Sequence, residues 1–354
     1  MNGLGARLKM ARRMAGISQR DLADAAGVSA MAISKYERDM DVPGSAVLIR
    51  LVQALGVKVE FLLRPTSVHL SSPAYRRRAS LPEREQDAIL ARVHEWLERY
   101  LAIENLVSQS PTFDVPVAID RNVSSLADVE RIVLELRQEW NLGWDPIENL
   151  TQVLEDHGVK VGQLDAHEDF DALTLWANDT FPVIVVKHGL PGDRQRYNLA
   201  HELGHLVIRP AAGVDAEKAA HRFAGAFLAP EPMARPDLGE RRVTLDLLEL
   251  HLLKHKYGLS MQAWIYRAKD LGIISEASAT QLFKEFRRRG WHLKEPGDAI
   301  PPEESARSTR LVLRALTEDV ISEGRAAELL GMPLARFWQQ EGEQHEGFPV
   351  ALRC

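Results

Sequence analysis

Apolar residues recur at helical spacing through residues 4–64, and short polar or glycine-containing breaks interrupt them. Ser18 and Ser29 stand where the N-caps of helices are expected, because their side-chain oxygens can accept hydrogen bonds from first-turn amides. Gly27 permits a tight turn shortly before Ser29. The pattern predicts five short helices, at residues 4–15, 19–26, 30–38, 45–55 and 59–62. The second and third of these, joined by the tight turn, are typical of a helix-turn-helix.

A stretch rich in proline and serine separates this part from the rest of the chain. Residues 66–82 are expected to be a linker, and its arginines, Arg76 to Arg78, either contact DNA or an acidic partner surface or lie in solvent. The pattern next predicts one long helix over residues 83–107. Its apolar stripe is expected to form a dimer seam, to support the flanking domains, or to be buried within the chain. The stripe consists of Ile89, Val93, Trp96, Leu97, Tyr100, Leu101 and Ile103.

The middle of the chain combines helices with strands. Residues 124–140 predict an amphipathic helix, and a further helix ends at His157. Three apolar runs bounded by turn residues predict the strands of a small sheet, at residues 158–161, 172–176 and 181–187. Residues 244–287 and 305–337 are helical again, and the tail after residue 340 is expected to be disordered. We find no internal repeat and no long low-complexity tract.

Two histidines stand at helical spacing shortly after the third predicted strand. His201 and His205 are four residues apart, so on a helix their imidazoles lie on one face and can point at the same atom. Glu202 flanks that point. Two neutral imidazoles beside a carboxylate are the set that a catalytic zinc ion and its general base require. Leu199 and Leu203 are expected to bury the remaining surface of this helix.

A third metal ligand is expected from the next predicted helix. Glu217 lies near the start of that helix, where its carboxylate can reach back to the two histidines, while Asp215 and His221 are competing ligands. His221 is on the same face as Glu217 and either orients a ligand or is a partly buried helix histidine. A second histidine pair at the same spacing, His251 and His255, has no intervening carboxylate, so we expect it to be structural.

Residues 125–300 resemble the ImmA/IrrE family of metallopeptidases. The resemblance rests on a predicted strand followed by two motifs in this order, Arg-Tyr-x-Leu-Ala-His-Glu-Leu-Gly-His and then Glu-x-x-Ala-x-x-Phe-Ala-x-x-x-Leu-x-Pro. The resemblance implies Zn²⁺ held by His201, His205 and Glu217, with Glu202 as catalytic base. The family often has Asn or Asp at the position of His221. The resemblance also implies a narrow substrate, a repressor or related regulator cleaved in stress response, mobile-element induction or toxin–antitoxin control. By analogy with other zinc peptidases, an edge strand would hold the substrate backbone.

The first part of the chain resembles the Cro/repressor-like helix-turn-helix family, also called XRE. The resemblance rests on Gly16, Ser18-Gln19, Leu22-Ala23, Gly27-Val28-Ser29 and Ile33-Ser34-Lys35-Tyr36. It implies that the third helix enters the major groove of double-stranded operator DNA. The side chains expected at base edges are Ala30, Met31, Ser34 and Lys35. The side chains expected near phosphates are Gln19, Arg20, Ser29 and Arg38. A homodimer is expected, because such modules usually bind paired half-sites.

Charge supports DNA contact only in this first part. The 354-residue chain carries a net charge of -6 and a pI of about 6.1, so it is not basic as a whole. Residues 1–65 hold ten Lys and Arg against six Asp and Glu, the local positive charge that phosphate contact requires. A helical module used for protein contacts is the alternative. The single cysteine, Cys354, excludes an intrachain disulfide and a zinc ribbon. The sequence also lacks a signal-peptide pattern and a membrane-spanning apolar run, which fits a cytoplasmic location.

These observations predict a mainly α chain. A five-helix helix-turn-helix domain would be followed by an α+β zincin-like metallopeptidase domain with a small sheet, and by a helical C-terminal region. The expected segments are the DNA-binding domain (1–65), a linker with a long helix (66–123), the peptidase domain (124–240), its helical extension (241–300) and a small helical region with a flexible tail (301–354). We expect a transcriptional regulator that cleaves a repressor or related protein. The alternative is a regulator whose peptidase-like domain senses a ligand or partner without proteolysis.

Overall fold

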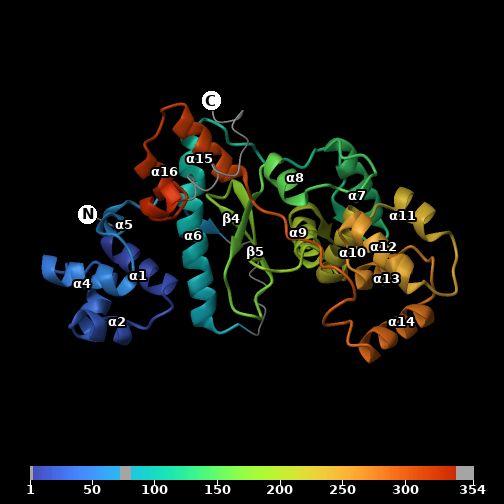
Figure 1. Cartoon of the computed structure of the whole chain (residues 1–354), viewed down its shortest axis with the longest axis horizontal. Coiled ribbons are helices and arrows are strands. Elements are labelled where there is room, and N and C mark those ends of the chain that lie inside the picture. The colour runs from blue at the N-terminus through green and yellow to red at the C-terminus, as the bar shows by residue number, and fades with distance from the viewer. Residues whose placement is uncertain (1–2, 72–80, 340–354) are drawn as a thin grey trace.

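The computed structural model describes residues 3–71 and 81–339 and begins with the five predicted helices (Figure 1). These are α1 (Leu4–Met14), α2 (Gln19–Ala26), α3 (Ala30–Glu37), α4 (Ser45–Leu55) and α5 (Val59–Leu63). Ser18 caps α2 in a capping box with Asp21, as the sequence indicates. Gly27 ends α2 with φ of 64°, a left-handed conformation that favours glycine. Leu22 and Ile33 are buried in a core that belongs to these helices alone.

The long helix α6 (Glu83–Leu106) stands between the N-terminal helices and the sheet (Figure 1). Val93 and Leu97 pack against the sheet, whereas Ile103 packs against the C-terminal helices. On the same helix, Glu98 pairs with the buried Arg7 of α1. The apolar stripe is therefore buried within the chain and supports three neighbouring parts of it. A dimer seam along this stripe is the wrong interpretation, because six of its seven side chains are buried and the seventh, Trp96, is half-buried.

The three predicted strands are present, and a fourth, very short strand joins them. They are β3 (Lys160–Leu164), β4 (Ala172–Ala177) and β5 (Phe181–Lys187), with β1 (Leu70–Ser71) beside the end of β4, in the order β1-β4-β5-β3. β5 is parallel to β3 and antiparallel to β4. Val183 and Val185 of β5 face α6, and Ile184 and Val186 face the opposite core. Both faces of β5 are covered, which explains its continuous apolar run.

Strand β1 lies in the stretch that the sequence predicts as a linker. Val68, just before it, is 5% exposed and belongs to the core between the sheet and α6. His69 N donates a hydrogen bond to the side chain of Asn178, at the turn between β4 and β5, over 2.8 Å. This part of the stretch is consequently packed onto the sheet. Arg76 to Arg78 and the tail after residue 340 lie outside the described residues.

Helices α8 (Leu150–Asp156) and α9 (Gly192–Val207) pack on the face of the sheet that is turned away from α6. Further helices pack on α9 and on one another beyond it. They are α7 (Asp128–Glu139), α10 (Ala216–Leu228), α11 (Glu231–Leu238), α12 (Leu247–Tyr257), α13 (Met261–Asp270) and α14 (Glu276–Arg288). A short parallel pair, β2 (Asn122–Val123) and β6 (Arg209–Pro210), joins the segment before α7 to the end of α9. Helix α7 begins later than predicted, because the amides of Ser124 and Ser125 donate to the carboxylate of Asp128.

The C-terminal part returns to α6 after crossing helix α9. Gly192 N donates to the carbonyl of Ile300 over 2.8 Å, and Arg196 forms an ion pair with Glu303. Helices α15 (Arg307–Thr317) and α16 (Glu323–Leu329) and the helical residues 334–339 then pack on α6. Across the described ranges, no helix combines the length and apolar character that crossing a membrane requires.

Candidate metal centre

Helix α9 carries both histidines and Glu202. Leu199, Leu203 and Val207 of this helix are buried in the main core, so its other face is turned towards the site. Gly204 lies where α9 crosses α10, and a Cβ there would stand 3.2 Å from the ring of Phe223. A larger residue would push the two helices apart. The small residue therefore allows α10 to approach closely enough for its first turn to meet the histidines.

The structure brings His201, His205 and Glu217 together. The two Nε2 atoms are 3.2 Å apart, Glu217 Oε2 lies 3.4 Å from His201 Nε2, and Glu217 Oε1 lies 3.6 Å from His205 Nε2. A tetrahedral zinc ion with bonds of about 2.0–2.2 Å places its ligand atoms about 3.3–3.6 Å apart. The three donors are therefore spaced as zinc ligands would be. Within the described parts of the chain, these are the residues that form a cluster able to hold a metal ion.

Burial prepares His201 for metal binding. Burial, together with the neighbouring His221 and His205, lowers the pKa of His201 to about 3, although Glu217 acts in the opposite direction. The imidazole is therefore neutral at pH 7, which is the form that donates a lone pair to a metal. The side chain of Glu217 is 43% exposed, so the site is open on the α10 side.

Asp215 and His221, the two competing ligands, do not join the metal-ligand cluster. Asp215 is the N-cap of α10, and its carboxylate accepts hydrogen bonds from the amides of Glu217 and Lys218 at 3.0 and 3.2 Å. This cap fixes the first turn of α10, and with it the position of Glu217. The ring of His221 lies beside His201, with 4.3 Å between the centroids. His221 is thus a neighbour of the cluster and not one of its three converging members.

Two residues near the cluster were missed by sequence reasoning. Thr174 of β4 donates a hydrogen bond from Oγ1 to Glu202 Oε2 over 2.6 Å, which fixes one oxygen of the expected base. Tyr197 stands four residues before His201 on α9, and its hydroxyl lies 3.2 Å from His221 Nδ1. The spacing of Tyr197 from His201 was a usable signal. Thr174 gave none, because its place opposite Glu202 depends on how the sheet packs against α9.

The second histidine pair is close together but has no carboxylate completing a cluster. The rings of His251 and His255 on α12 are 4.7 Å apart. His251 packs directly against the backbone at Gly297, where a Cβ would stand 2.3 Å from the ring. This pair is not among the groups in the described ranges that could hold a metal.

The side chains expected to contact DNA gather on α2 and α3. Arg20, Ser29, Ala30, Met31, Lys35 and Arg38 are exposed, and Ser34 is half-buried. Ser29 also caps α3. Gln19 differs from the others, because its amide donates to Glu37 Oε2 over 2.7 Å. Glu37 is in turn paired with Arg12. Contact of these residues with DNA stays a prediction.

Comparison with known proteins supports both the helix-turn-helix segment and the segment that contains the metal-ligand cluster. Residues 8–62 match the model of a helix-turn-helix family, and residues 154–269 match the model of the IrrE N-terminal-like domain. No curated protein matches the chain. A solved structure described as "Crystal structure of PrgX/iCF10 complex" shares 13% identity over 93% of this chain and 98% of that chain, with a TM-score of 0.16. That score carries no argument about fold. The chain therefore joins an XRE-type helix-turn-helix segment to a peptidase-like segment that matches the IrrE N-terminal-like domain, and His201, Glu202, His205 and Glu217 lie within the second segment.

Proposed function

We propose that this protein is a DNA-binding regulator that hydrolyses a peptide bond in a repressor or related regulatory protein. The observation that carries the proposal is the convergence of His201, His205 and Glu217 beside Glu202, within the segment that matches the IrrE-like domain. Double-stranded operator DNA would bind at α2 and α3. The DNA-binding part would bring the peptidase part to the regulators that act at the same operators.

The chain's own residues divide the work of hydrolysis. Zn²⁺ held by the three ligands would supply Lewis-acid activation of water and of the scissile carbonyl. Glu202 is placed to accept a proton from the attacking water and to return it to the leaving amine. Thr174 donates a hydrogen bond to one carboxylate oxygen of Glu202 and would hold the carboxylate in one orientation while it exchanges the proton. His221 lies beside His201 and contacts Tyr197, and these two side chains would contact the substrate near the reacting carbonyl.

Metal content is the first test. Protein purified without chelator should contain about one zinc per chain by mass spectrometry of metals. His201→Ala should lose it. His255→Ala is the matched control, because His255 belongs to a histidine pair of the same spacing and should keep full zinc. Absence of zinc from the wild-type protein, or equal loss in both variants, would contradict the proposed ligands.

Proteolysis requires a separate test. Newly formed protein N-termini should be compared between cells that produce the wild-type protein and cells that produce Glu202→Gln. We expect a small set of cleavage sites, in DNA-binding regulators, that is present only with the wild type while both proteins bind zinc. If the two profiles are the same and zinc is bound, the domain senses a ligand or partner and does not cleave.

A further inference from the structure

The C-terminal helices repeat the first three helices of the N-terminal domain, α1 to α3, which the sequence pattern did not reveal. Ser322 caps α16 by accepting a hydrogen bond from the amide three residues on, as Ser18 does at the start of α2. Gly331 follows α16 with φ of 71°, and Gly27 follows α2 with φ of 64°. The same number of residues separates serine from glycine in both places. A helix packed before them and a helix after them complete both units.

Hydrogen bonds and buried positions of the two units match at a constant difference in residue number. Val28 N donates to the carbonyl of Ala23, and Met332 N donates to that of Ala327, each over 3.0 Å. Five pairs of buried positions also correspond without insertion or deletion, whereas Leu329 is buried where the aligned Ala25 is exposed. The matched buried pairs are Leu8 and Val312, Ala11 and Ala315, Leu22 and Ala326, Ala23 and Ala327, and Ile33 and Phe337. Helices α15 and α16 and residues 334–339 consequently form a second helix-turn-helix.

The second unit lacks the chemistry expected of a DNA reader. Four residues expected to contact DNA have different residues at the matching positions of the second unit. Glu323 corresponds to Gln19, Gly324 to Arg20, Pro333 to Ser29 and Gln339 to Lys35. A carboxylate repels phosphate, proline has no amide hydrogen, and glycine has no side chain to donate. The positive charge that supports phosphate contact is therefore missing from these positions.

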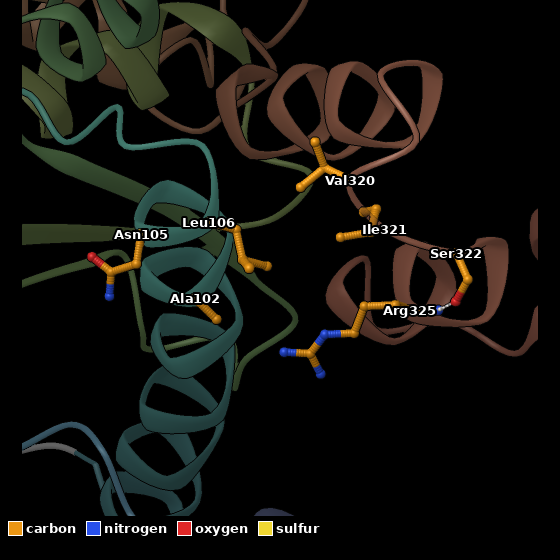
Figure 2. Close-up of a pocket in the computed structure, with 7 residues that line it drawn as sticks. All are labelled: Ala102, Asn105, Leu106, Val320, Ile321, Ser322 and Arg325. Carbon is orange, nitrogen blue, oxygen red and sulfur yellow. Dashed lines mark hydrogen bonds between the residues drawn. The ribbon is translucent and has the colours of Figure 1, made fainter.

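An apolar hollow lies where the second unit meets α6 (Figure 2). It measures about 600 Å³, and Ala102 and Leu106 of α6 lie across it from Val320 and Ile321. Leu106 is 46% exposed and Val320 is 50% exposed. Nearby, Trp338 is 53% exposed and donates its indole N–H to Glu323 over 2.8 Å. Large apolar side chains grouped in this way on a surface mark an interaction site.

We propose that this face, the surface around Leu106, Val320 and Trp338, binds the same face of a second copy of the chain. A twofold contact requires a surface that is complementary to itself. This face offers both protruding apolar groups and a hollow. It also carries both charges close together. Arg325 lines the hollow and is paired with Glu328, and Glu323 stands next to Ser322, which also lines the hollow. Two copies can therefore place these groups beside opposite charges across the contact.

The position of the face suits a DNA-binding dimer. The second unit rests on the same helix, α6, that holds the DNA-binding domain, and Glu328 of α16 lies 3.6 Å from Arg64 beyond α5. Pairing at this face would therefore hold two helix-turn-helix domains in one assembly, as paired half-sites require. The α6 stripe cannot provide the contact, since it is buried inside the chain.

The mass of the full chain in solution, measured by light scattering without DNA, tests the proposal. We expect about twice the chain mass of 39.7 kDa for the wild type and the single chain mass for Val320→Glu. Val243→Glu is the matched control, because Val243 is an 88% exposed valine before α12 and should leave the dimer intact. Circular dichroism should show all three proteins equally folded. A monomeric wild type, or a dimeric Val320→Glu protein, would overturn the proposal.

DNA binding by the second unit is the competing outcome, and a salt titration separates it. Arg336 is exposed on the last described helix of the unit. With a random-sequence duplex, Arg336→Ala should leave the dependence of binding on salt unchanged, whereas Lys35→Ala should lower the slope by about one. A lowered slope for Arg336→Ala would show that the second unit contacts phosphates and would overturn its assignment as a protein-binding face. Neither experiment depends on zinc or on proteolysis.

Discussion

Thr174 and Glu202 meet between β4 and α9, where a strand side chain fixes the expected catalytic carboxylate. Replacement of Thr174 by Val keeps the shape of the side chain and removes the donor. A hydrogen bond to a charged group contributes about 1.5–3 kcal/mol. We therefore expect Thr174→Val to slow substrate cleavage by roughly 10- to 100-fold at unchanged zinc content. Cleavage rates on a substrate found by N-terminus profiling, with metal analysis of the same samples, would measure this.

Thr174→Ser is the control for that substitution. Serine retains the hydroxyl, so its rate should stay within a few-fold of the wild type. Equal losses in the valine and serine variants would mean that the methyl group, through packing, matters more than the hydrogen bond. A valine variant with full activity would remove Thr174 from the mechanism.

A site residue is easier to predict from the sequence when its position in the site depends only on nearby residues of the chain. His201, Glu202 and His205 stand on one helix, so their spacing alone predicts that they share a site. Glu217 needs two helices to pack closely, which the sequence only suggests through the small residue Gly204 and the family resemblance. The contact of Thr174 depends on strand register and on the packing of sheet against helix, and a single sequence does not contain that information.

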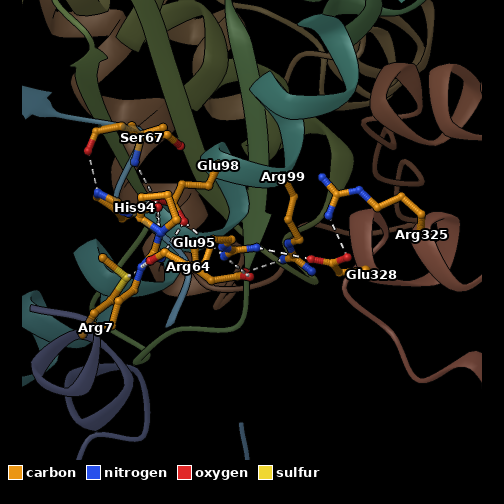
Figure 3. A network of polar contacts seen from close by, with 12 residues as sticks. Arg7, Arg64, Ser67, His94, Glu95, Glu98, Arg99, Arg325 and Glu328 are labelled. Atoms are coloured by element: carbon orange, nitrogen blue, oxygen red, sulfur yellow. Dashed lines mark hydrogen bonds and ion pairs between the residues drawn. The ribbon is translucent and has the colours of Figure 1, made fainter. Parts of the chain in front are cut away.

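At the scale of secondary-structure elements, a buried ion pair joins α1 of the DNA-binding domain to α6 (Figure 3). Arg7 Nη1 and Glu98 Oε2 are 2.6 Å apart, and the Arg7 side chain has no exposed surface. Arg7 also donates to the carbonyls of Arg64 and Pro65, and Arg64 itself reaches Glu98 at 3.1 Å. The single carboxylate of Glu98 is thus shared by two arginines at the junction between α1, α5 and α6, and Glu95 adds a second negative charge 3.6 Å from Arg64.

Replacement of Glu98 by Ala should be strongly destabilising. It leaves the charge of Arg7 buried without its partner, and the loss of one member of a buried pair costs about 3–5 kcal/mol. Urea unfolding should therefore show a decrease of that size in the free energy of unfolding. Glu135→Ala is the control, since Glu135 forms an exposed pair with Arg131 and should change stability by less than about 1 kcal/mol. Similar small effects of both substitutions would show that the α1–α6 junction is open to water.

The elements themselves were largely predictable, and the exceptions have physical causes. The helices of residues 4–64 and strands β3 to β5 follow from spacing and breaks that lie within each segment. Strand β1 has two residues and forms because it pairs with an edge of β4. Its own local sequence therefore does not predict a strand. The repeated helix-turn-helix was hidden because its core residues changed in compensating ways. Leu22 and Ile33 correspond to Ala326 and Phe337, a smaller and a larger side chain in one core.

At the scale of the whole molecule, the two matched domains and the C-terminal unit share one helix. The sheet packs on one side of α6, α1 joins it through Arg7, and the C-terminal unit packs at Ile103 (Figure 1). The segment before α15 returns across α9, where Glu303 pairs with Arg196 and accepts amide hydrogen bonds from Leu150 and Thr151. In the described ranges the chain is therefore closed on itself, and unfolding of one of these parts exposes surface that another of them covers.

This closure predicts that zinc stabilises the entire chain. A ligand that binds only the folded state at a hundred times its dissociation constant adds about 2.7 kcal/mol, and in a chain of this size we expect Tm to rise by roughly 2–4 °C. In calorimetry, the zinc-loaded protein should show one unfolding transition that a chelator moves down as a whole. His201→Ala should unfold in one transition that neither zinc nor chelator moves. Two transitions, of which zinc shifts only one, would show instead that the DNA-binding part unfolds independently. Helix α6 would then be a spacer that does not link the stability of the metal centre to that of the DNA-binding helices.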